Sequence, residues 1–345
     1  MSTLLQRNPK RISLDGLTGS SDALFLAALY LEMPHPALFI LGDREEAAYF
    51  QNDIENLLGE QKALLFPSSY KKPYHLDQTD NSQVLQRAEV LTRINKHPNN
   101  FLIVSYPEAI HERVITKKSL ERNTMEVKLG EVLNVDFITE FLTDNNFTRT
   151  DFVYEPGQFA IRGGIVDVYS FAHEMPYRIE FYGNKIESIR AFDPSTQLSE
   201  QNMAFVTIIP NIQSGIITEA HESFFDFIPK ETVVYGKDLD YTYNAIETSM
   251  QKIEERFGET IVIEEEQTVR NIEDLFDTKD QFKSNIENHI VVEFGAKPFY
   301  EEATTISFNT KPQPHFNKNF NILLENLYNN QKKGYVNLLF SDSAK

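Results

Sequence analysis

The sequence predicts an α/β protein in which a parallel sheet is interrupted by a small α+β module. Short, wholly apolar runs alternate with helical patterns from about residue 12 to 118, and the same rhythm returns between about 201 and 310. Between about 119 and 200 the chain instead carries mostly alternating strand patterns, which predicts the module. A chain of 345 residues is long enough for more than one domain.

Four segments follow from these patterns. Residues 1–118 and 201–310 are expected to form one α/β domain, and residues 119–200 the inserted module. Residues 311–345 hold a linker, one helix pattern and one strand pattern, which we interpret as the start of a further α/β domain. Because that strand pattern has no helix after it to cover it, we expect the chain to be a truncated piece of a longer protein.

Individual elements of the α/β domain are readable from the pattern. Strand runs are ALFILGD (37–43), KALLFP (62–67), FLIVSY (101–106), AFVTIIP (204–210) and TVVYG (232–236). Asp43 and Glu46 have the spacing of a capping box, so a helix is expected to follow the first of these runs. Further helices are predicted around residues 84–91 and 246–257, where apolar residues recur at helical spacing.

A loop before the first helix resembles an altered phosphate-binding loop. The form G-x-x-x-x-G-K-[ST] binds phosphates through backbone N–H groups and a lysine, and its hydroxyl ligates magnesium. Gly16 fits the first position, but Ser21, Asp22 and Ala23 replace the second glycine, the lysine and the hydroxyl residue. A carboxylate at the lysine position would repel a polyphosphate, so we predict no ATP chemistry here. A plain Gly/Ser turn before a buried helix explains the stretch equally well.

In the module, a two-residue Gly183-Asn184 connection predicts a hairpin between the runs PYRIEFY and KIESIRAFD. Strand alternation places Tyr177, Ile179 and Phe181 on one face of the first run, and Arg178, Glu180 and Tyr182 on the other. If the first set covers the core of the module, the second set is presented to solvent. Arg162 stands directly before Gly163-Gly164, where a bulge or sharp bend is expected. Arginine and tyrosine are enriched in interface hot spots, although an ordinary solvated sheet face carries the same residues.

Composition excludes several classes of function. A formal net charge of −18 opposes autonomous binding to phosphate backbones, although a local basic patch remains compatible with it. The chain has no cysteine, which excludes disulfides and thiolate metal sites. The sequence shows neither a membrane-length apolar run nor the apolar core of a secretion signal, so we expect a cytoplasmic protein without membrane contact.

Two common catalytic patterns are absent from the sequence. The eight histidines are scattered, and neither H-E-x-x-H nor G-x-S-x-G occurs. Asp167 could pass for a magnesium ligand at a strand end, but a structural role is the better interpretation because no partner residue accompanies it. Tyr70, Lys71, Lys72 and Tyr74 form a small basic and aromatic cluster, which suits either a surface loop or a weak nucleic-acid contact.

The stretch from Tyr154 to Ser199 resembles the bacterial transcription-repair coupling factors (the Mfd family), in the module that they share with the excision-repair protein UvrB. PGQFAIRGGIVDVY, PYRIEFYG and ESIRAFDPSTQ carry this resemblance. Upstream, GLTGSSDALFLAAL is similar to the G-x-T-G-S-G-K-T loop of UvrB with its nucleotide-binding residues replaced. The resemblance covers roughly the first 210 residues and is looser beyond them.

The resemblance implies that the small module recruits UvrA, the damage-recognition ATPase of nucleotide excision repair. The family's UvrA-contacting arginines fall on Arg162 and Arg178, and its aromatic contact falls on Tyr182, where relatives often have phenylalanine. The tyrosine keeps the ring and adds a hydroxyl. The segment that would carry UvrB's strand-separating hairpin is too short here to form it.

The function implied is therefore a non-enzymatic recruitment module that links stalled RNA polymerase to excision repair. Cofactors are expected only outside this chain, since the family's ATP- and magnesium-dependent motor lies in a later region. Contacts with RNA polymerase and DNA, and a C-terminal domain that masks the UvrA face, likewise belong to regions absent here. The alternative is an ATP-dependent DNA helicase or damage-verification domain like UvrB.

Overall fold

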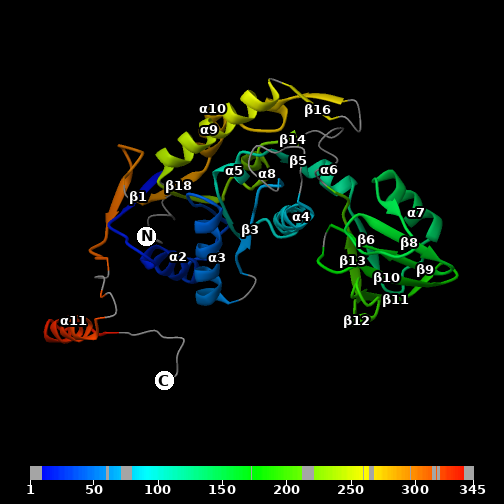
Figure 1. The fold of residues 1–345 in the computed structure, drawn as a ribbon, viewed down its shortest axis with the longest axis horizontal. Coiled ribbons are helices and arrows are strands. Elements are labelled where there is room, and N and C mark those ends of the chain that lie inside the picture. The colour runs from blue at the N-terminus through cyan, green and yellow to red at the C-terminus, as the bar shows by residue number, and fades with distance from the viewer. Residues whose placement is uncertain are drawn as a thin grey trace.

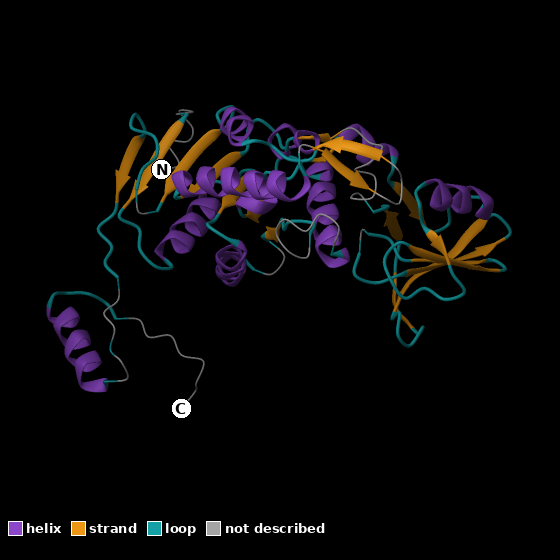
Figure 2. Cartoon of the chain, turned by 45° about the horizontal axis from the view of Figure 1, so that its top comes forward, coloured by secondary structure: helices purple, strands orange, loops and turns teal. Residues whose placement is uncertain are grey.

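A computed structural model of the chain describes residues 10–59, 62–70, 80–171, 173–211, 221–258, 260–263, 268–295, 297–312, 316 and 319–337. The larger part of this chain is an α/β domain, and a smaller, strand-rich module lies at the opposite end of the molecule (Figure 1 and Figure 2). This arrangement is the predicted fold class.

A seven-stranded sheet with the order β19-β1-β18-β15-β2-β4-β3 forms the centre of the α/β domain. All of its neighbouring strands are parallel. Its strands are β1 (Arg11–Asp15), β2 (Ala37–Ile40), β3 (Leu64–Leu65), β4 (Leu102–Ser105), β15 (Val233–Lys237), β18 (Ile290–Phe294) and β19 (Thr304–Ser307). The sheet takes strands from before and after the module in chain order, so the module is an insertion, as predicted.

Helices cover both faces of this sheet, which explains why its strands are apolar on both sides. The helices are α2 (Ser21–Glu32), α3 (Arg44–Leu58), α4 (Asn81–Lys96), α5 (Pro107–Ile110), α6 (Lys117–Arg122), α8 (Phe224–Phe227), α9 (Leu239–Phe257), the 3-10 turn η2 (Ile272–Asp274) and α10 (Lys279–Ile286). Ala37 and Phe39 pack in the core that contains α2 and α3. Leu38 and Ile40 pack in the opposite core, with residues of α4, α9 and α10.

The module is a six-stranded sheet with the order β12-β11-β10-β9-β8-β7, accompanied by a two-stranded sheet of β6 and β13 and by helix α7. Its elements are β6 (Met125–Lys128), α7 (Val135–Asp144), β7 (Thr148–Arg149), β8 (Gln158–Arg162), β9 (Ile165–Val168), β10 (Tyr177–Tyr182), β11 (Lys185–Phe192), β12 (Ser199–Asn202) and β13 (Phe205–Ile208). Ile138 and Leu142 of α7 pack against Ile179 and Ile189 on one face of the six-stranded sheet. The other face carries Arg162 and Arg178.

Local chemistry explains several element boundaries. Asp43 accepts a hydrogen bond from the N–H of Glu46 and begins α3, but the Glu46 carboxylate bonds the N–H of Gly42 instead of completing a capping box. Gly183, with a φ of 60°, turns β10 into β11, so the predicted hairpin is confirmed. At Gly164, a Cβ would lie 2.8 Å from the carbonyl oxygen of Phe181, which requires glycine beside this close approach of two strands.

Some elements were not predicted. Two small antiparallel pairs, β5 (Val114–Ile115) with β14 (His221–Glu222) and β16 (Thr260–Ile263) with β17 (Thr268–Asn271), flank the α/β domain. The strand run predicted at 62–67 contains only the two-residue β3, and the edge strand β19 had no separate prediction. β13 lies beyond residue 200 but pairs with β6 in the module.

The C-terminal segment contains one described helix, α11 (Phe320–Lys332), which stands apart from both sheets and buries none of its residues (Figure 1). The strand predicted after it is not formed at residues 335–337, and residues 338–345 lie outside the described chain.

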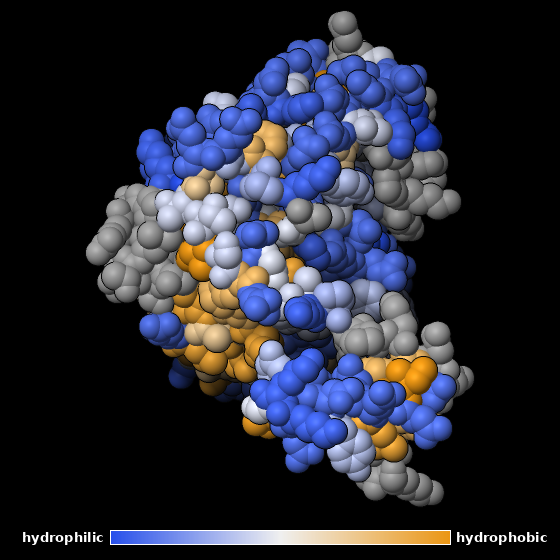
Figure 3. Space-filling view, turned by 90° about the vertical axis from the view of Figure 1, so that its left-hand side faces the viewer, coloured by the Kyte–Doolittle hydropathy of each residue, from blue (hydrophilic) through white to orange (hydrophobic). Residues whose placement is uncertain are grey.

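Figure 3 looks from the side of α2 and α11 and shows mostly hydrophilic surface around a hydrophobic area. In α2, Leu24 and Leu31 are both exposed. Among the described helices, none is long and apolar enough to cross a membrane.

Candidate functional site

The altered phosphate loop is covered by a segment of the same chain. Gly16 has a φ of 82°, and a Cβ at this position would lie 2.2 Å from the carbonyl oxygen of Phe308. The N–H of Phe308 donates to the carbonyl of Asp15 over 2.7 Å, and Thr310 donates to the carbonyl of Gly16. The segment that follows β19 therefore lies directly against the loop that a phosphate would contact.

The residues at the replaced positions stabilise the loop itself. The Ser21 hydroxyl donates to the carbonyl of Thr18 over 2.7 Å and accepts from its N–H over 2.8 Å. Ala23 is buried in the core beside α2. Asp22 is 8% exposed, and its carboxylate accepts the N–H of Ala23 over 2.7 Å.

Lys237, at the end of β15, approaches the same carboxylate. Its Nζ lies 3.6 Å from Asp22 Oδ2 and 2.5 Å from Glu46 Oε1. Burial raises the pKa of Asp22, while the Ala23 N–H and Lys237 oppose that rise. Burial would lower the pKa of Lys237, but the two carboxylates outweigh it and raise that pKa. Sequence reasoning missed Lys237, although a lysine directly after an apolar strand run marks the edge of a parallel sheet where ligands usually bind.

In the module, one buried carboxylate joins the two predicted arginines. Asp167 of β9 is fully buried. It accepts Arg178 Nε over 2.7 Å and Arg178 Nη2 over 2.9 Å, and it also forms an ion pair with Arg162. The strand register explains why the three side chains lie together. Asp167 pairs directly with Arg178 on β10. On β8 it pairs with Ala160, and Arg162 lies two residues further along on the same face of the sheet. The structural role predicted for Asp167 agrees with this geometry.

The three predicted contact residues differ in exposure. The side chain of Arg162 is 37% exposed and that of Arg178 only 15%, while Tyr182 is 77% exposed. Arg178 also donates to the carbonyl of Gln197 over 3.2 Å and lies 4.5 Å from the centre of the Phe192 ring. The expectation that Arg178 is presented to solvent is therefore wrong, because these contacts enclose its guanidinium. Its hydrogen bonds to Asp167 raise its pKa, so it stays charged.

Around these residues the face is polar and internally paired. Glu180 forms an ion pair with Arg190 on β11 and accepts the hydroxyl of Ser188 over 2.6 Å. Tyr182 closes the strand opposite Lys185, beside the Gly163-Gly164 turn, where Phe181 donates to the Gly164 carbonyl. Arg162 and Tyr182 thus lie at the same end of the sheet, as the accessible arginine and the accessible ring.

Two further kinds of site were considered possible from the sequence: the basic and aromatic cluster at residues 70–74, and a metal site. Tyr70 is buried, and Lys71, Lys72 and Tyr74 lie outside the described residues, so the basic and aromatic cluster stays a prediction. Among the described residues, no group of three His, Asp or Glu side chains lies close enough together to hold a metal ion.

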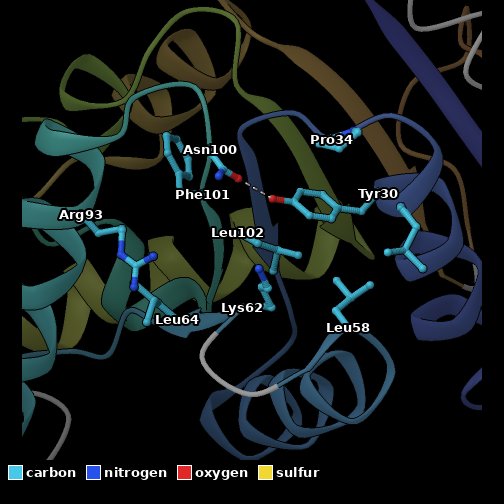
Figure 4. Close-up of a pocket in the computed structure, with 10 residues that line it drawn as sticks. Tyr30, Pro34, Leu58, Lys62, Leu64, Arg93, Asn100, Phe101 and Leu102 are labelled. Carbon is cyan, nitrogen blue, oxygen red and sulfur yellow. Dashed lines mark hydrogen bonds between the residues drawn. The ribbon is translucent and has the colours of Figure 1, made fainter.

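A hollow at the amino-terminal edge of the large sheet is shown in Figure 4, where the Tyr30 hydroxyl donates to Asn100 Oδ1 over 3.1 Å. Apolar side chains such as Pro34 and Leu58 supply much of its wall, with Lys62 and Arg93 as its charged groups. The described lining includes no carboxylate, so it offers no acid–base pair.

Comparison with known proteins gives two kinds of match. Residues 125–213 match the family model of the UvrB interaction domain. Over the curated proteins, the chain is 28% identical over 207 residues to the transcription-repair-coupling factor of Bacillus subtilis (strain 168). It is 28% identical over 210 residues to that of Myxococcus xanthus, and 24% identical over 197 residues to that of Escherichia coli (strain K12).

These matches cover 57 to 60% of this chain but only 17 or 18% of each relative. They support the predicted resemblance to the N-terminal UvrB-homology region of transcription-repair-coupling factors. The matched interaction domain contains Arg162, Asp167, Arg178 and Tyr182.

Proposed function

We propose that this chain is a non-enzymatic recruitment module that binds UvrA and thereby links stalled RNA polymerase to nucleotide excision repair. The observation that carries the proposal is the sheet face at Arg162 and Tyr182, within the part of the chain that matches the UvrB interaction domain. An exposed guanidinium and an exposed aromatic ring at the same end of the sheet suit a partner surface that offers carboxylates, since charge-assisted hydrogen bonds fix both strength and orientation. Such a role belongs in the cytoplasm.

The absence of catalysis is part of the proposal. Phe308 and Thr310 occupy the space beside Gly16, and Asp22 is engaged by Lys237. A polyphosphate would have to displace the Phe308 and Thr310 segment from Gly16. It would also be repelled by the carboxylate of Asp22. We therefore assign no cofactor to this chain. ATP, magnesium, RNA polymerase and DNA would be bound by regions of a longer protein, and a C-terminal domain there would mask the UvrA face until the motor engages.

The test is the dissociation constant of the complex with UvrA. Arg162→Ala and Tyr182→Ala remove accessible side chains, so each is expected to weaken binding by about tenfold or more. Tyr182→Ala is expected to leave the melting temperature unchanged, whereas Arg162→Ala is expected to lower it because the buried Asp167 loses one ion-pair partner. Arg149→Ala is the control, because Arg149 is an exposed arginine in the edge strand β7 of the same module. Arg178→Ala is less informative alone, since it also leaves the buried Asp167 with fewer partners.

Unchanged affinity in both Arg162→Ala and Tyr182→Ala would remove this interface. The competing UvrB-like helicase function is tested by titration with Mg-ATP, for which we expect no measurable binding. ATP binding that Asp22→Ala abolishes would favour the helicase. We expect these 345 residues alone to bind UvrA without activation.

A further inference from the structure

Two loops of the module lie against the face that carries Arg162 and Arg178. The first follows β7 and is held by the N–H of Thr150, which donates to the carbonyl of Phe159 over 2.8 Å. The second follows β11, and Gln197 Nε2 in it donates to the carbonyl of Val153 over 3.1 Å. Val153 is fully buried, so the two loops are fixed to each other and to the sheet.

Three large side chains on these loops nevertheless remain exposed: Phe152 (49%), Tyr154 (55%) and Leu198 (67%). We call these three residues the apolar shoulder. The ring of Phe152 lies 5.2 Å from the guanidinium carbon of Arg162, so the shoulder adjoins the accessible arginine. Backbone hydrogen bonds and Val153 already hold the loops, so the fold does not require these exposed side chains.

The positive charge of Arg162 beside the shoulder favours a partner surface that carries a carboxylate. Arg162 uses Nη2 for Asp167 and donates Nη1 to the carbonyl of Asp151 over 3.1 Å. A guanidinium has five N–H donors, so Arg162 keeps capacity for a further carboxylate. An aromatic ring under an arginine and apolar neighbours around it match the composition of protein interface hot spots.

We propose that the UvrA-binding surface extends from Arg162 over the apolar shoulder, with Phe152 and Tyr154 as its aromatic contacts. This inference rests on the proposed function. The partner surface would place a carboxylate on Arg162 and an apolar patch against Phe152, Tyr154 and Leu198. The contact with UvrA therefore covers two sides of Arg162, with Tyr182 on one side and the shoulder on the other.

The experiment measures UvrA affinity for Phe152→Ala, Tyr154→Ala and Leu198→Ala, each with a thermal melt. Phe137→Ala is the matched control, because Phe137 is 54% exposed but lies on α7, which packs against the opposite face of the sheet. Phe152→Ala and Tyr154→Ala are each expected to weaken binding by about tenfold, and the control by less than about twofold. Phe152 is the shoulder residue whose ring stacks near Arg162, so the effect of Tyr154→Ala reports the shoulder more directly than that of Phe152→Ala.

A photo-crosslinking phenylalanine analogue gives a second readout. Placed at position 154 it is expected to form a covalent adduct with UvrA, and placed at position 137 it is expected to form none. If the shoulder variants keep wild-type affinity while Arg162→Ala weakens binding, the shoulder is wrong and the recruitment function stands. If Arg162→Ala, Tyr182→Ala and the shoulder variants all keep wild-type affinity, both the proposed interface and its extension fail.

Discussion

At the scale of the residue, Asp167 determines how the two arginines of the candidate site are presented. Its buried carboxylate holds both guanidinium groups, and a buried charge without partners would be strongly unfavourable. Arg178 supplies two of its hydrogen bonds and is itself enclosed, whereas Arg162 supplies one ion pair from a more exposed position. The same residue type is therefore enclosed at one position and left accessible for the proposed contact at the other.

His111 gives the chain a residue-scale dependence on pH. It is buried, its Nε2 lies 3.1 Å from the Ser249 hydroxyl, and burial lowers its pKa from 6.5 to about 4. Between pH 6.5 and about 4, His111 is therefore protonated in the unfolded chain but neutral in the folded chain. The stability from neutral His111 is complete above pH 6.5 and is lost as the pH falls toward 4, by about 3 kcal/mol in total.

The measurement is denaturant unfolding of wild type and His111→Gln between pH 7 and pH 4. Glutamine keeps a polar group near Ser249 but does not titrate, so the loss of unfolding free energy on acidification is expected to be smaller in the variant. Half-buried His35 and buried His289 also have lowered pKa values, so part of the pH dependence of the unfolding free energy remains in the variant. Parallel curves for the two proteins would contradict the prediction.

At the scale of the element, β19 and the residues after it hold the altered loop against the sheet. Gly16→Ala must accept both a positive φ and a Cβ 2.2 Å from a backbone oxygen of Phe308. Gly19→Ala is a matched control, since Gly19 has a φ of 59° but no heavy atom within 4 Å of its Cβ position. The control is expected to cost about 1 kcal/mol of unfolding free energy, and Gly16→Ala about 2 kcal/mol more.

Denaturant unfolding of both variants measures the difference between them. Equal losses would mean that the Phe308 segment yields easily and does not hold the loop. A larger loss in Gly16→Ala would support the view that this segment is an integral part of the loop's structure.

Elements that depend on local pattern could be predicted from the sequence, and those that depend on distant partners could not. The apolar run at 37–43 and the Gly183-Asn184 hairpin contain their own signals in period and turn chemistry. β19 has weak signals of its own and forms because β1 offers an edge for parallel pairing. Lys237 reaches Asp22 from a strand more than 200 positions along the chain, which no local pattern encodes.

In the candidate site, too, features that depend on local pattern could be predicted and features that depend on distant residues could not. Alternation correctly placed Tyr177 and Ile179 in the core and Tyr182 on the opposite face. It could not reveal that Arg178 is enclosed, because Phe192 and Gln197 arrive from β11 and the loop after it. The exposed Phe152 also had no periodic signal, since it lies in a loop.

At the scale of the whole molecule, the net charge of −18 limits what the chain can bind. A duplex presents a phosphate charge about every 1.7 Å of helix axis, and affinity comes largely from cations that replace its counterions. An acidic surface repels that array, and the arginines of the candidate face are already paired with Asp167 and Glu180. We therefore expect no measurable duplex binding at about 0.1 M salt.

Fluorescence anisotropy with a labelled duplex, repeated from low to physiological salt, tests this expectation. The informative variant is Lys71→Ala with Lys72→Ala, which removes the basic residues of the predicted basic and aromatic cluster. Binding that falls steeply with salt and is abolished in the double variant would contradict the expectation and locate a DNA contact in that cluster. Because the proposed UvrA contact involves the inserted module and not residues 71 and 72, the double variant is expected to bind UvrA like wild type, so loss of DNA binding and loss of recruitment can be told apart in the same protein.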